Sequence, residues 1–468
     1  MLFSSVIFLC YFLPAVLVLY YLLFFSRTAQ NVLLLIASLL FYAWGEPVYV
    51  LLMLFSVLFN SLMGYLVQGE RKGKRFFLTV ALACNLGLLF VFKYLGFLLK
   101  GAGVQGFSPR LPIGISFYTF QALSYVADVY WGKVRAENPF YVGLYISFFP
   151  QLIAGPILTY STVAEQIRHR KESWDGFCLG ACRFVAGLGK KVLLSNNFAA
   201  IADNVFAWSA IGTERLQVPA MLAWVGSIAY SLQIYFDFSG YSDMAIGLGA
   251  MFGFRFPENF NYPYAAVSIT DFWRRWHISL TGWFREYVYI PLGGNRHENK
   301  DIMVRNLFLV WLFTGIWHGA NWTFLLWGLF YFLVQLAERF FGYAEKIPGP
   351  VWNRVYTLLT VNLAWVVFRA DDLYQAGRFY LNMLGLNRNG IWSDAAVLFL
   401  RENWVFFLAG IIFSAPVARM GNEYLYKTGS RLNRILAVCY PAGMLLLLLT
   451  CMAYLVSGSY NPFIYFNF

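Results

Sequence analysis

Long stretches without a charged side chain dominate this sequence. Apolar residues fill 60% of the 468 positions and charged residues only 12%, whereas soluble domains carry about 25% charged residues. A helix needs ~20 mostly apolar residues to cross the hydrocarbon core of a bilayer, and several stretches are long enough. They predict an all-α polytopic membrane protein with about 10–12 helices that cross or dip into the bilayer. In chain order they are Met1–Ser26, Thr28–Gly45, Pro47–Gly69, Phe76–Phe92, Leu111–Ala127, Pro139–Ala164, Leu216–Phe236, Asn306–Ala337, Val355–Phe368, Asn403–Val417 and Ile435–Phe468.

The distribution of basic residues predicts an orientation. The stretch Met1–Ser26 has no basic start and no small-residue cleavage site, so we expect it to be a retained first helix. The densest basic cluster near a span end is Arg71–Arg75, which the positive-inside rule places in the cytoplasm. Counting back through three spans puts the N-terminus outside. The net charge of +12 fits basic loops that meet anionic lipid better than it fits nucleic-acid binding.

The composition favours one domain, residues 1–468, with an unusual region at 253–305. We find no linker, no internal repeat and no metal-ligand spacing around the six cysteines. From Arg255 to Arg305 the sequence becomes polar and aromatic, which suits short helices at the membrane interface or re-entering it. Ser268 or Thr270 is expected to cap one such helix.

On that helix Trp273, Trp276 and His277 would share a face, while Arg274 and Arg275 would point away. An arginine cluster suits a phosphate-bearing ligand, and lipid headgroups are an equally good partner. The basic residues that we expect to form this rim are Arg255, Arg274, Arg275, Arg285 and Arg296.

His318 is the strongest candidate for chemistry. No Asp, Glu, Lys or Arg occurs between Arg305 and Glu338, and the chain has only four histidines. An ionisable group at membrane depth is costly, and a low dielectric keeps imidazole neutral and able to accept a proton. The alternative is a packing role with hydrogen bonds to Asn321 or Thr314. The stretch Asn306–Ala337 is predicted to be one long tilted helix or a helix broken near Gly315 and Gly319.

Two further groups carry polar side chains, each with a structural alternative. His277 follows an arginine pair, and by itself it would suit an interfacial, snorkelling histidine. Asp237 and Asp243 lie at the end of an apolar span, where they would orient a histidine, bind a substrate hydroxyl or simply end the helix.

The sequence gives no support for a covalent serine or cysteine enzyme or a phosphate-binding loop. Its glycines in one stretch are instead expected to pack helices together: Gly240, Gly247, Gly249 and Gly253.

Five motifs together resemble the membrane-bound O-acyltransferase (MBOAT) family, in particular its bacterial branch that O-acetylates alginate, peptidoglycan and cellulose. The resemblance covers essentially the whole chain. The motifs are Leu111–Tyr118, Leu152–Pro156, Tyr235–Ala245, Phe272–Leu280 and Trp317–Asn321.

The resemblance implies a fold and a site. The fold would be a ring of tilted transmembrane helices with re-entrant segments around a central tunnel. The family's catalytic histidine falls on His318 and its second site position on His277. Residues expected to contact donor or substrate are Arg274, Arg275, Trp276, Asn321, Asp237 and Asp243.

The resemblance also implies substrates and partners. Acetyl-CoA would be the acyl donor, with no permanently bound cofactor, and an extracytoplasmic SGNH-hydrolase-like protein would be the partner that completes transfer to a polysaccharide. The location would be the bacterial inner or plasma membrane. Rival hypotheses are the related teichoic-acid D-alanyl transfer, and a noncatalytic polysaccharide export component, which should show inverted repeats.

The predicted orientation can be tested by cysteine labelling. In a variant without the six native cysteines, a cysteine placed beside Met1 should react with a membrane-impermeant thiol reagent added to intact cells. A cysteine at position 73 should react only after lysis, because the basic loop is predicted to face the cytoplasm. The reverse pattern would invert the orientation.

Overall fold

The computed structural model describes the chain except residues 70–72, 105, 108, 211–217, 295–299, 418–419, 422–430, 459 and 465–468, and only the backbone of 345 and 431–438. Every element in the described residues is a helix, which confirms the all-α prediction. The chain divides into two compact units, Met1–Val185 with Tyr241–Glu258 and Ala186–Gly240 with Asn259–Phe468. The single-domain prediction stays a prediction.

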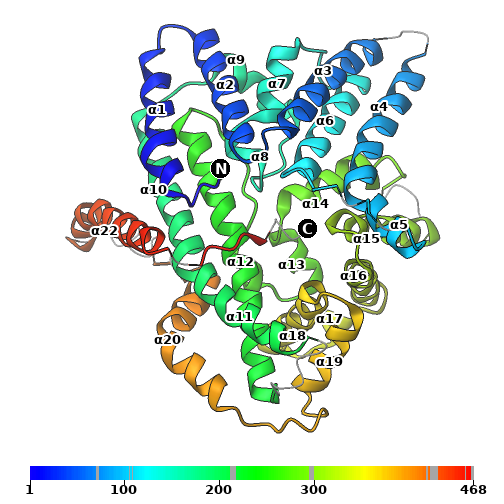
Figure 1. Ribbon diagram of the computed structural model, residues 1–468, viewed down its shortest axis with the longest axis vertical. Helices are drawn as coiled ribbons and strands as arrows, with labels where there is room; N and C mark the ends of the chain where they lie inside the picture. The colour runs from blue at the N-terminus through cyan, green and yellow to red at the C-terminus, as the bar shows by residue number, and fades with distance from the viewer. Residues whose placement is uncertain are drawn as a thin grey trace. The chain divides into compact units, whose positions relative to one another are not determined.

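The first unit contains the N-terminal helices. Within it α3, α4 and α6 pack against one another, as do α2, α3 and α7 (Figure 1). Its elements are η1 (Phe8–Phe12), α1 (Leu13–Leu22), α2 (Arg27–Gly45), α3 (Tyr49–Val67), α4 (Lys74–Leu89), η2 (Phe90–Leu95), α5 (Gly96–Gly101), α6 (Ile115–Tyr130), α7 (Pro139–Ser147), α8 (Phe149–Leu152), α9 (Tyr160–His169) and most of α10 (Trp174–Gly189).

The second unit contains the predicted histidine pair. The helices α13, α16 and α18 contact one another in it and surround the site described below. Its elements are η3 (Lys190–Ser195), α11 (Asn196–Trp208), the first part of α12 (Ala220–Met251), η4 (Pro263–Ala265), α13 (Ile269–Arg275), α14 (Ile278–Phe284), η5 (Arg285–Tyr289), α15 (Lys300–His318), α16 (Trp322–Phe341), α17 (Tyr343–Lys346), α18 (Gly349–Arg369), α19 (Leu373–Met383), α20 (Asp394–Ser414) and α22 (Arg431–Val456).

The described residues include six helical segments long and apolar enough to cross a membrane. A shorter apolar segment, Phe8–Leu22, precedes them. The expected total of about 10–12 therefore depends on shorter or more polar helices that dip into the bilayer. The stretch Pro139–Ala164, for example, folds as the short helices α7 and α8 and the start of α9 rather than as one span. The six segments are Arg27–Gly45, Tyr49–Val67, Lys74–Gly101, Trp322–Phe341, Asp394–Ser414 and Cys439–Val456.

The long helix α12 corrects one prediction. Its 32 residues span about 48 Å, and the helix continues past the motif, so the alternative that the two acids end the helix is wrong. Asp237 and Asp243 therefore lie inside a helix and not at its end. The polar motif does not break the helix because Asp237 and Asp243 both have cationic partners in their own units.

Glycines on α12 allow close approach of neighbouring backbones. A Cβ atom on Gly247 would lie 2.5 Å from the carbonyl oxygen of Gly180, and one on Gly240 would lie 2.8 Å from that of Gly187. These two glycines therefore pack helices together, as predicted. The prediction is wrong for Gly253, whose φ of +81° places it in the turn that follows the helix.

The stretch around His318 forms a hairpin of two helices, α15 and α16, which lie side by side (Figure 1). A Cβ atom on Gly315 would lie 2.7 Å from the carbonyl oxygen of Phe324, and one on Gly328 would lie 2.6 Å from that of Trp311. Only glycine allows so close an approach. Of the two predicted alternatives, the broken helix is the correct one, and the break begins at Gly319.

Candidate active site

His277 and His318 line the same cavity in the second unit. Its volume is about 20 Å³, roughly the space for a single water molecule. Apart from the two imidazoles, every described residue in its wall is apolar or aromatic: Ile234, Phe238, Trp276, Trp327, Trp365, Phe368 and Ile464. The structure thus brings together the two histidines that the sequence analysis selected.

The short helix α13 that leads to His277 is fixed at its start. The hydroxyl of Ser268 accepts a hydrogen bond from the amide of Asp271 at 3.0 Å, so Ser268 is the cap. The carboxylate of Glu338 on α16 accepts the amides of Ile269 at 2.7 Å and of Thr270 at 2.8 Å. An acidic group at a helix N-terminus is electrostatically favourable, and here it ties α13 to α16.

His277 does not lie on that helix, contrary to the prediction. The helix ends at Arg275, and His277 has φ 44° and ψ 54°, the left-handed region that is unfavourable for a side chain with a Cβ atom. The reason is a tertiary one. The segment at Asn259–Asn261 bonds to both sides of the turn, because the amide of Asn261 donates to Arg275 O and the amide of Ile278 donates to Asn259 O, each at 3.0 Å.

The side chain of Asn259 determines the tautomer of His277. Its Oδ1 atom accepts the backbone amide of Ser279 at 3.2 Å, and since an amide N–H can only donate, the atom facing it must be the oxygen. The same oxygen lies 3.2 Å from Nδ1 of His277, so Nδ1 carries the proton and donates. The Nε2 atom is then the unprotonated nitrogen. It is buried and has no hydrogen-bond partner among the described residues.

Burial keeps His277 neutral. The residue is only 2% exposed and lies outside the six candidate spans. Desolvation lowers the pKa of its imidazole to about 3, because the charged form cannot be solvated there. The edge of the ring also packs against Phe238, with ring centroids 4.5 Å apart and planes at 87°. Near neutral pH the ring is therefore an acceptor of hydrogen bonds at Nε2.

His318 is the last residue of α15, where the helix backbone ends and the chain turns towards α16. Its ring stands edge-on to two aromatic rings, those of Trp327 at 5.1 Å and 84° and of Phe368 at 5.0 Å and 81°. Thr314 donates to the carbonyl of Val310, and Asn321 caps α16 by accepting the amide of Thr323 at 3.1 Å. The two neighbours expected to hold His318 in a packing role thus have partners of their own.

Asp237 fixes a segment of the chain that forms part of the cavity wall. It forms an ion pair with Lys191 at 2.6 Å, and both side chains are 1% exposed. Its second oxygen accepts the amide of Ile464 at 2.9 Å, while Lys191 donates to the carbonyl of Pro462. Removal of either charge would leave the other buried and unpaired, and such a loss typically lowers the stability of the fold by about 3–5 kcal/mol. The ion pair therefore holds the C-terminal segment whose Ile464 forms part of the cavity wall.

The other predicted contact residues lie in several places. Trp276 lines the cavity and stacks on Phe272, with centroids 5.5 Å apart. Arg274 is exposed, and Arg275 binds both oxygens of Asp271 at 3.0 Å. Asn321 donates to the carbonyl of Asp371 at 2.7 Å.

Of the remaining predicted residues, Asp243 and Arg255 lie in the first unit, whereas Arg285 lies in the second unit with the histidines. Asp243 pairs with Arg183 at 2.8 Å in the first unit, which also contains Arg255. Arg285 begins η5, and Arg296 lies outside the described residues.

Sequence reasoning missed Asn259, Lys191 and four aromatic wall residues, Phe238, Trp327, Trp365 and Phe368. Asn259 stands in an aromatic, proline-containing stretch that has no periodicity, so its partner 18 residues along the chain could not be read from spacing. The high density of tryptophan around both histidines was the one available signal.

Taken together, the described residues form a multi-pass helical membrane protein in which the imidazoles of His277 and His318 line one aromatic cavity. Residues 138–374 match MBOAT, the membrane-bound O-acyltransferase family. The chain belongs to this family and is an O-acyltransferase enzyme.

Similarity to individual relatives extends over the whole chain. The chain is 39% identical to the probable alginate O-acetylase AlgI of Azotobacter vinelandii over 100% of both chains. It is 44% identical to the protein of the same name from Pseudomonas aeruginosa, over 84% of this chain and 76% of the relative. It is 34% identical to the peptidoglycan O-acetyltransferase of Helicobacter pylori, over 100% of this chain and 98% of the relative. The predicted resemblance to the bacterial O-acetyltransferase branch is confirmed.

The role of Asn259 gives a prediction. Asn259→Ala should reduce acyl transfer strongly, by roughly 10²-fold or more, because His277 would lose the acceptor that fixes its tautomer. Loss of the shared acceptor of His277 and Ser279 should also lower the thermal midpoint of the purified protein.

The matched control is Asn261→Ala, since Asn261 is exposed and bonds through its backbone amide. This variant should keep both activity and midpoint. Equal loss in the two variants would refute a specific role for the Asn259 side chain.

Proposed function

We propose that this enzyme moves an acetyl group from a cytoplasmic donor across the membrane for O-acetylation of an extracytoplasmic polysaccharide such as alginate, peptidoglycan or cellulose. Relatives that match the entire chain carry the names alginate O-acetylase and peptidoglycan O-acetyltransferase. The observation that carries the proposal is the pair of imidazoles facing one cavity that is otherwise apolar and aromatic. A base in an aromatic site that admits little water suits proton transfer from a bound hydroxyl.

In the proposed reaction, His318 is the general base. It takes the proton of the acceptor hydroxyl while the hydroxyl oxygen attacks the carbonyl carbon of the acetyl thioester. A tetrahedral intermediate forms, its carbon–sulfur bond breaks, and the imidazolium returns the proton to the departing thiolate. The products are an acetyl ester and a free thiol. Holding the two reactants in line inside the cavity lowers the entropic part of the barrier.

His277 is proposed to orient the acceptor molecule through a donor group other than the reacting hydroxyl, because the single proton of that hydroxyl passes to His318. Its Nδ1–H donates to Asn259 and its Nε2 has no partner among the described residues. A neutral ring with this tautomer accepts a hydrogen bond from the cavity side, so it suits a hydroxyl group better than a developing oxyanion. One ring is thus proposed to position the acceptor molecule, and the other to remove the proton of its reacting hydroxyl.

We further propose acetyl-CoA as the donor, with Arg274 and Arg275 in contact with its phosphates. Arg274 is exposed and carries a charge that a phosphate could bind. Arg275 is fixed by Asp271 at 3.0 Å and is still 33% exposed at its side chain. Asp237 is proposed to act on the substrate only indirectly, through the C-terminal segment that it holds at the cavity.

We place the enzyme in the bacterial inner or plasma membrane with its N-terminus outside, and we expect an extracytoplasmic SGNH-hydrolase-like protein to complete the transfer to the polymer. The immediate acceptor is then a hydroxyl of that partner or of the sugar itself. Isolation of the acetylated species from membranes with and without the partner would separate these two acceptors.

Replacement of His318 tests the catalytic assignment. In cells that lack the endogenous gene, the His318→Ala variant should reach the membrane in normal amount. The ester-linked acetate that alkali releases from the surface polysaccharides should fall below about a hundredth of the amount that the wild-type gene restores. The reason is that general-base catalysis contributes a factor of roughly 10²–10⁴ to the rate. His277→Ala should also reduce the acetate.

The control is His169→Ala, which removes an exposed imidazole at the end of α9 in the first unit and should restore full acetylation. Wild-type acetylation by His318→Ala would overturn the assignment and place the general base at another residue. Release of D-alanine in place of acetate would favour the D-alanyl transfer alternative.

The donor proposal is tested by the arginine pair. Arg274→Gln alone should raise the KM for radiolabelled acetyl-CoA in isolated membranes by about tenfold, since one charge-assisted hydrogen bond is worth roughly 1.5–3 kcal/mol. The double variant with Arg275→Gln should raise it further with little change in kcat.

The matched control is Arg354→Gln, which removes an exposed guanidinium from the first half of α18. Its KM should stay that of the wild type. An unchanged KM in the double variant would move the donor site elsewhere, while a fall in kcat alone would show that the pair positions the His277 turn.

A further inference from the structure

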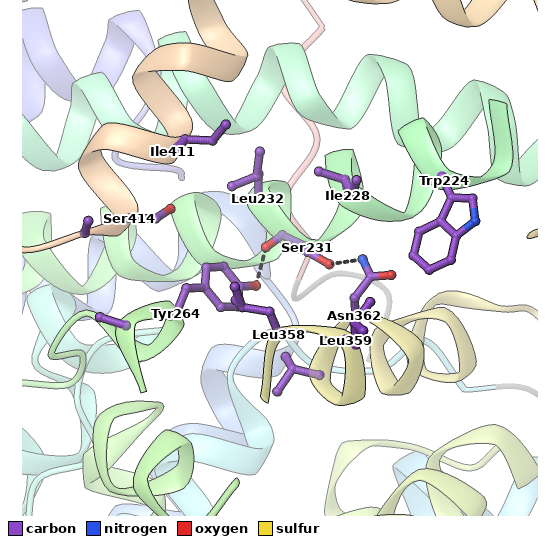
Figure 2. A pocket seen from close by; sticks show the side chains of 13 residues that line it. Trp224, Ile228, Ser231, Leu232, Tyr264, Leu358, Leu359, Asn362, Ile411 and Ser414 are labelled. Atoms are coloured by element: carbon purple, nitrogen blue, oxygen red, sulfur yellow. Dashed lines mark hydrogen bonds between the residues drawn. The ribbon is translucent and has the colours of Figure 1, made fainter. Parts of the chain in front are cut away.

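A second cavity of about 440 Å³ lies in the same unit as the histidines and has no role in the proposed reaction. Its walls come from α12, α18, α20 and the turn η4 (Figure 2). The volume is within the range of about 300–1,000 Å³ that small-molecule sites show. None of the described residues that line it is charged, so its ligand should be neutral in the part that it buries.

One wall of the cavity carries a hydrogen-bonded group whose proton positions can be assigned (Figure 2). The hydroxyl of Ser231 donates to the carbonyl of Ser227 at 3.0 Å, so its only proton is used. The side-chain atom of Asn362 that lies 2.8 Å from the Ser231 hydroxyl oxygen must therefore be a donor, Nδ2. Tyr264 donates to the carbonyl of Ser231 and fixes the same turn of α12.

This assignment leaves the Oδ1 atom of Asn362 as an acceptor. It is buried and has no hydrogen-bond partner among the described residues, and Asn362 as a whole is 8% exposed. The hydroxyl of Ser414 on α20 is likewise buried without a hydrogen-bond partner among the described residues, and Ser414 is 8% exposed. Buried polar atoms in native proteins nearly always have a partner. A ligand that donates a proton to Asn362 would supply one.

The rim of the cavity indicates where that ligand comes from. Four apolar residues that line the cavity are exposed: Ile228, Leu358, Leu359 and Ile411. Ile411 belongs to α20, a candidate membrane span with only 11% of its apolar window buried. Exposed apolar side chains on such a span meet lipid tails. The cavity thus combines an apolar, lipid-facing rim with an uncharged acceptor inside.

We propose that this cavity binds a membrane lipid with a single acyl chain and a free hydroxyl group, of the monoacylglycerol type. The acyl chain lies against the apolar walls formed by α18 and α20, and a hydroxyl of the head donates to Asn362 Oδ1. A lipid with an anionic group in the cavity does not fit, since the described walls offer no cation. No residue in the part of the chain that the structure describes lines both this cavity and the histidine cavity.

The test measures lipid binding and needs no acyl transfer, so it is independent of the proposed function. The full-length protein in nanodiscs is titrated with monooleoylglycerol and, separately, with methyl oleate, which has the same chain and no donor. Native mass spectrometry counts the bound molecules. Monooleoylglycerol should bind saturably as a single molecule, and methyl oleate should bind about three- to tenfold more weakly, as the loss of one hydrogen bond requires.

Variants locate the site. Asn362→Leu removes the acceptor at similar size and should weaken monooleoylglycerol binding about three- to tenfold while leaving methyl oleate binding unchanged. The control is Asn204→Leu, the same change at an exposed position of α11, which should alter neither. Equal binding of the two lipids to the wild type, or an unchanged affinity in Asn362→Leu, would overturn the proposal. Non-saturable addition of both lipids would do the same and would assign the Asn362 acceptor to water.

A measurement on the unmodified chain guards against a variant that fails to fold. A monoacylglycerol with a photoreactive group in its tail should cross-link to residues of the cavity rim on α18 and α20, such as Leu358 and Ile411. Excess monooleoylglycerol should abolish these cross-links. Labelling only at other helices, or labelling at the rim that monooleoylglycerol does not displace, would refute the site.

Discussion

The convergence of three donors on one amide oxygen is the interaction on which the histidine site depends. Asn259 Oδ1 lies within hydrogen-bond distance of His277 Nδ1 and of both the amide and the hydroxyl of Ser279. These bonds hold the left-handed turn at His277, which an isolated chain would avoid. They also decide which nitrogen of the ring is free. Local strain, tautomer and the direction of Nε2 therefore have a single physical cause.

Around this turn, aromatic packing provides the environment that makes the imidazoles useful. The ring of Phe238 packs nearly perpendicular to His277 at a centroid distance of 4.5 Å. The rings of Trp327 and Phe368 pack in the same way on His318, at 5.1 and 5.0 Å. These aromatic rings add no charge, and the burial of His277 favours the neutral form of its ring. On another side, the buried pair of Lys191 and Asp237 holds Ile464 in the cavity wall. The wall and the bases thus come from segments far apart in the sequence.

How far the sequence could predict this arrangement depended on the range of the interactions. Apolar stretches indicated an all-helical membrane protein, and Gly315 and Gly319 indicated a break near His318 as one of two alternatives, because both are local properties. The end of α13 at Arg275 was missed, since it is imposed by backbone hydrogen bonds from the segment at Asn259. Likewise, the motif containing Asp237 suggests a helix end or a substrate contact, and only its tertiary partner Lys191 reveals a structural role.

The central claim is that the cavity presents His277 as a neutral ring, protonated at Nδ1 with Nε2 unprotonated. Burial lowers the pKa of this imidazole to about 3. The charge of the ring should therefore stay constant from about pH 5 to about pH 8, whereas an unperturbed histidine titrates at about pH 6.5. The direct measurement is nitrogen NMR of histidine-labelled protein in lipid across this range, with the His277→Ala variant to assign the signals. The account predicts a constant pair of shifts for a neutral ring with the proton on Nδ1. A titration near pH ~6.5, or shifts that place the proton on Nε2, would contradict it.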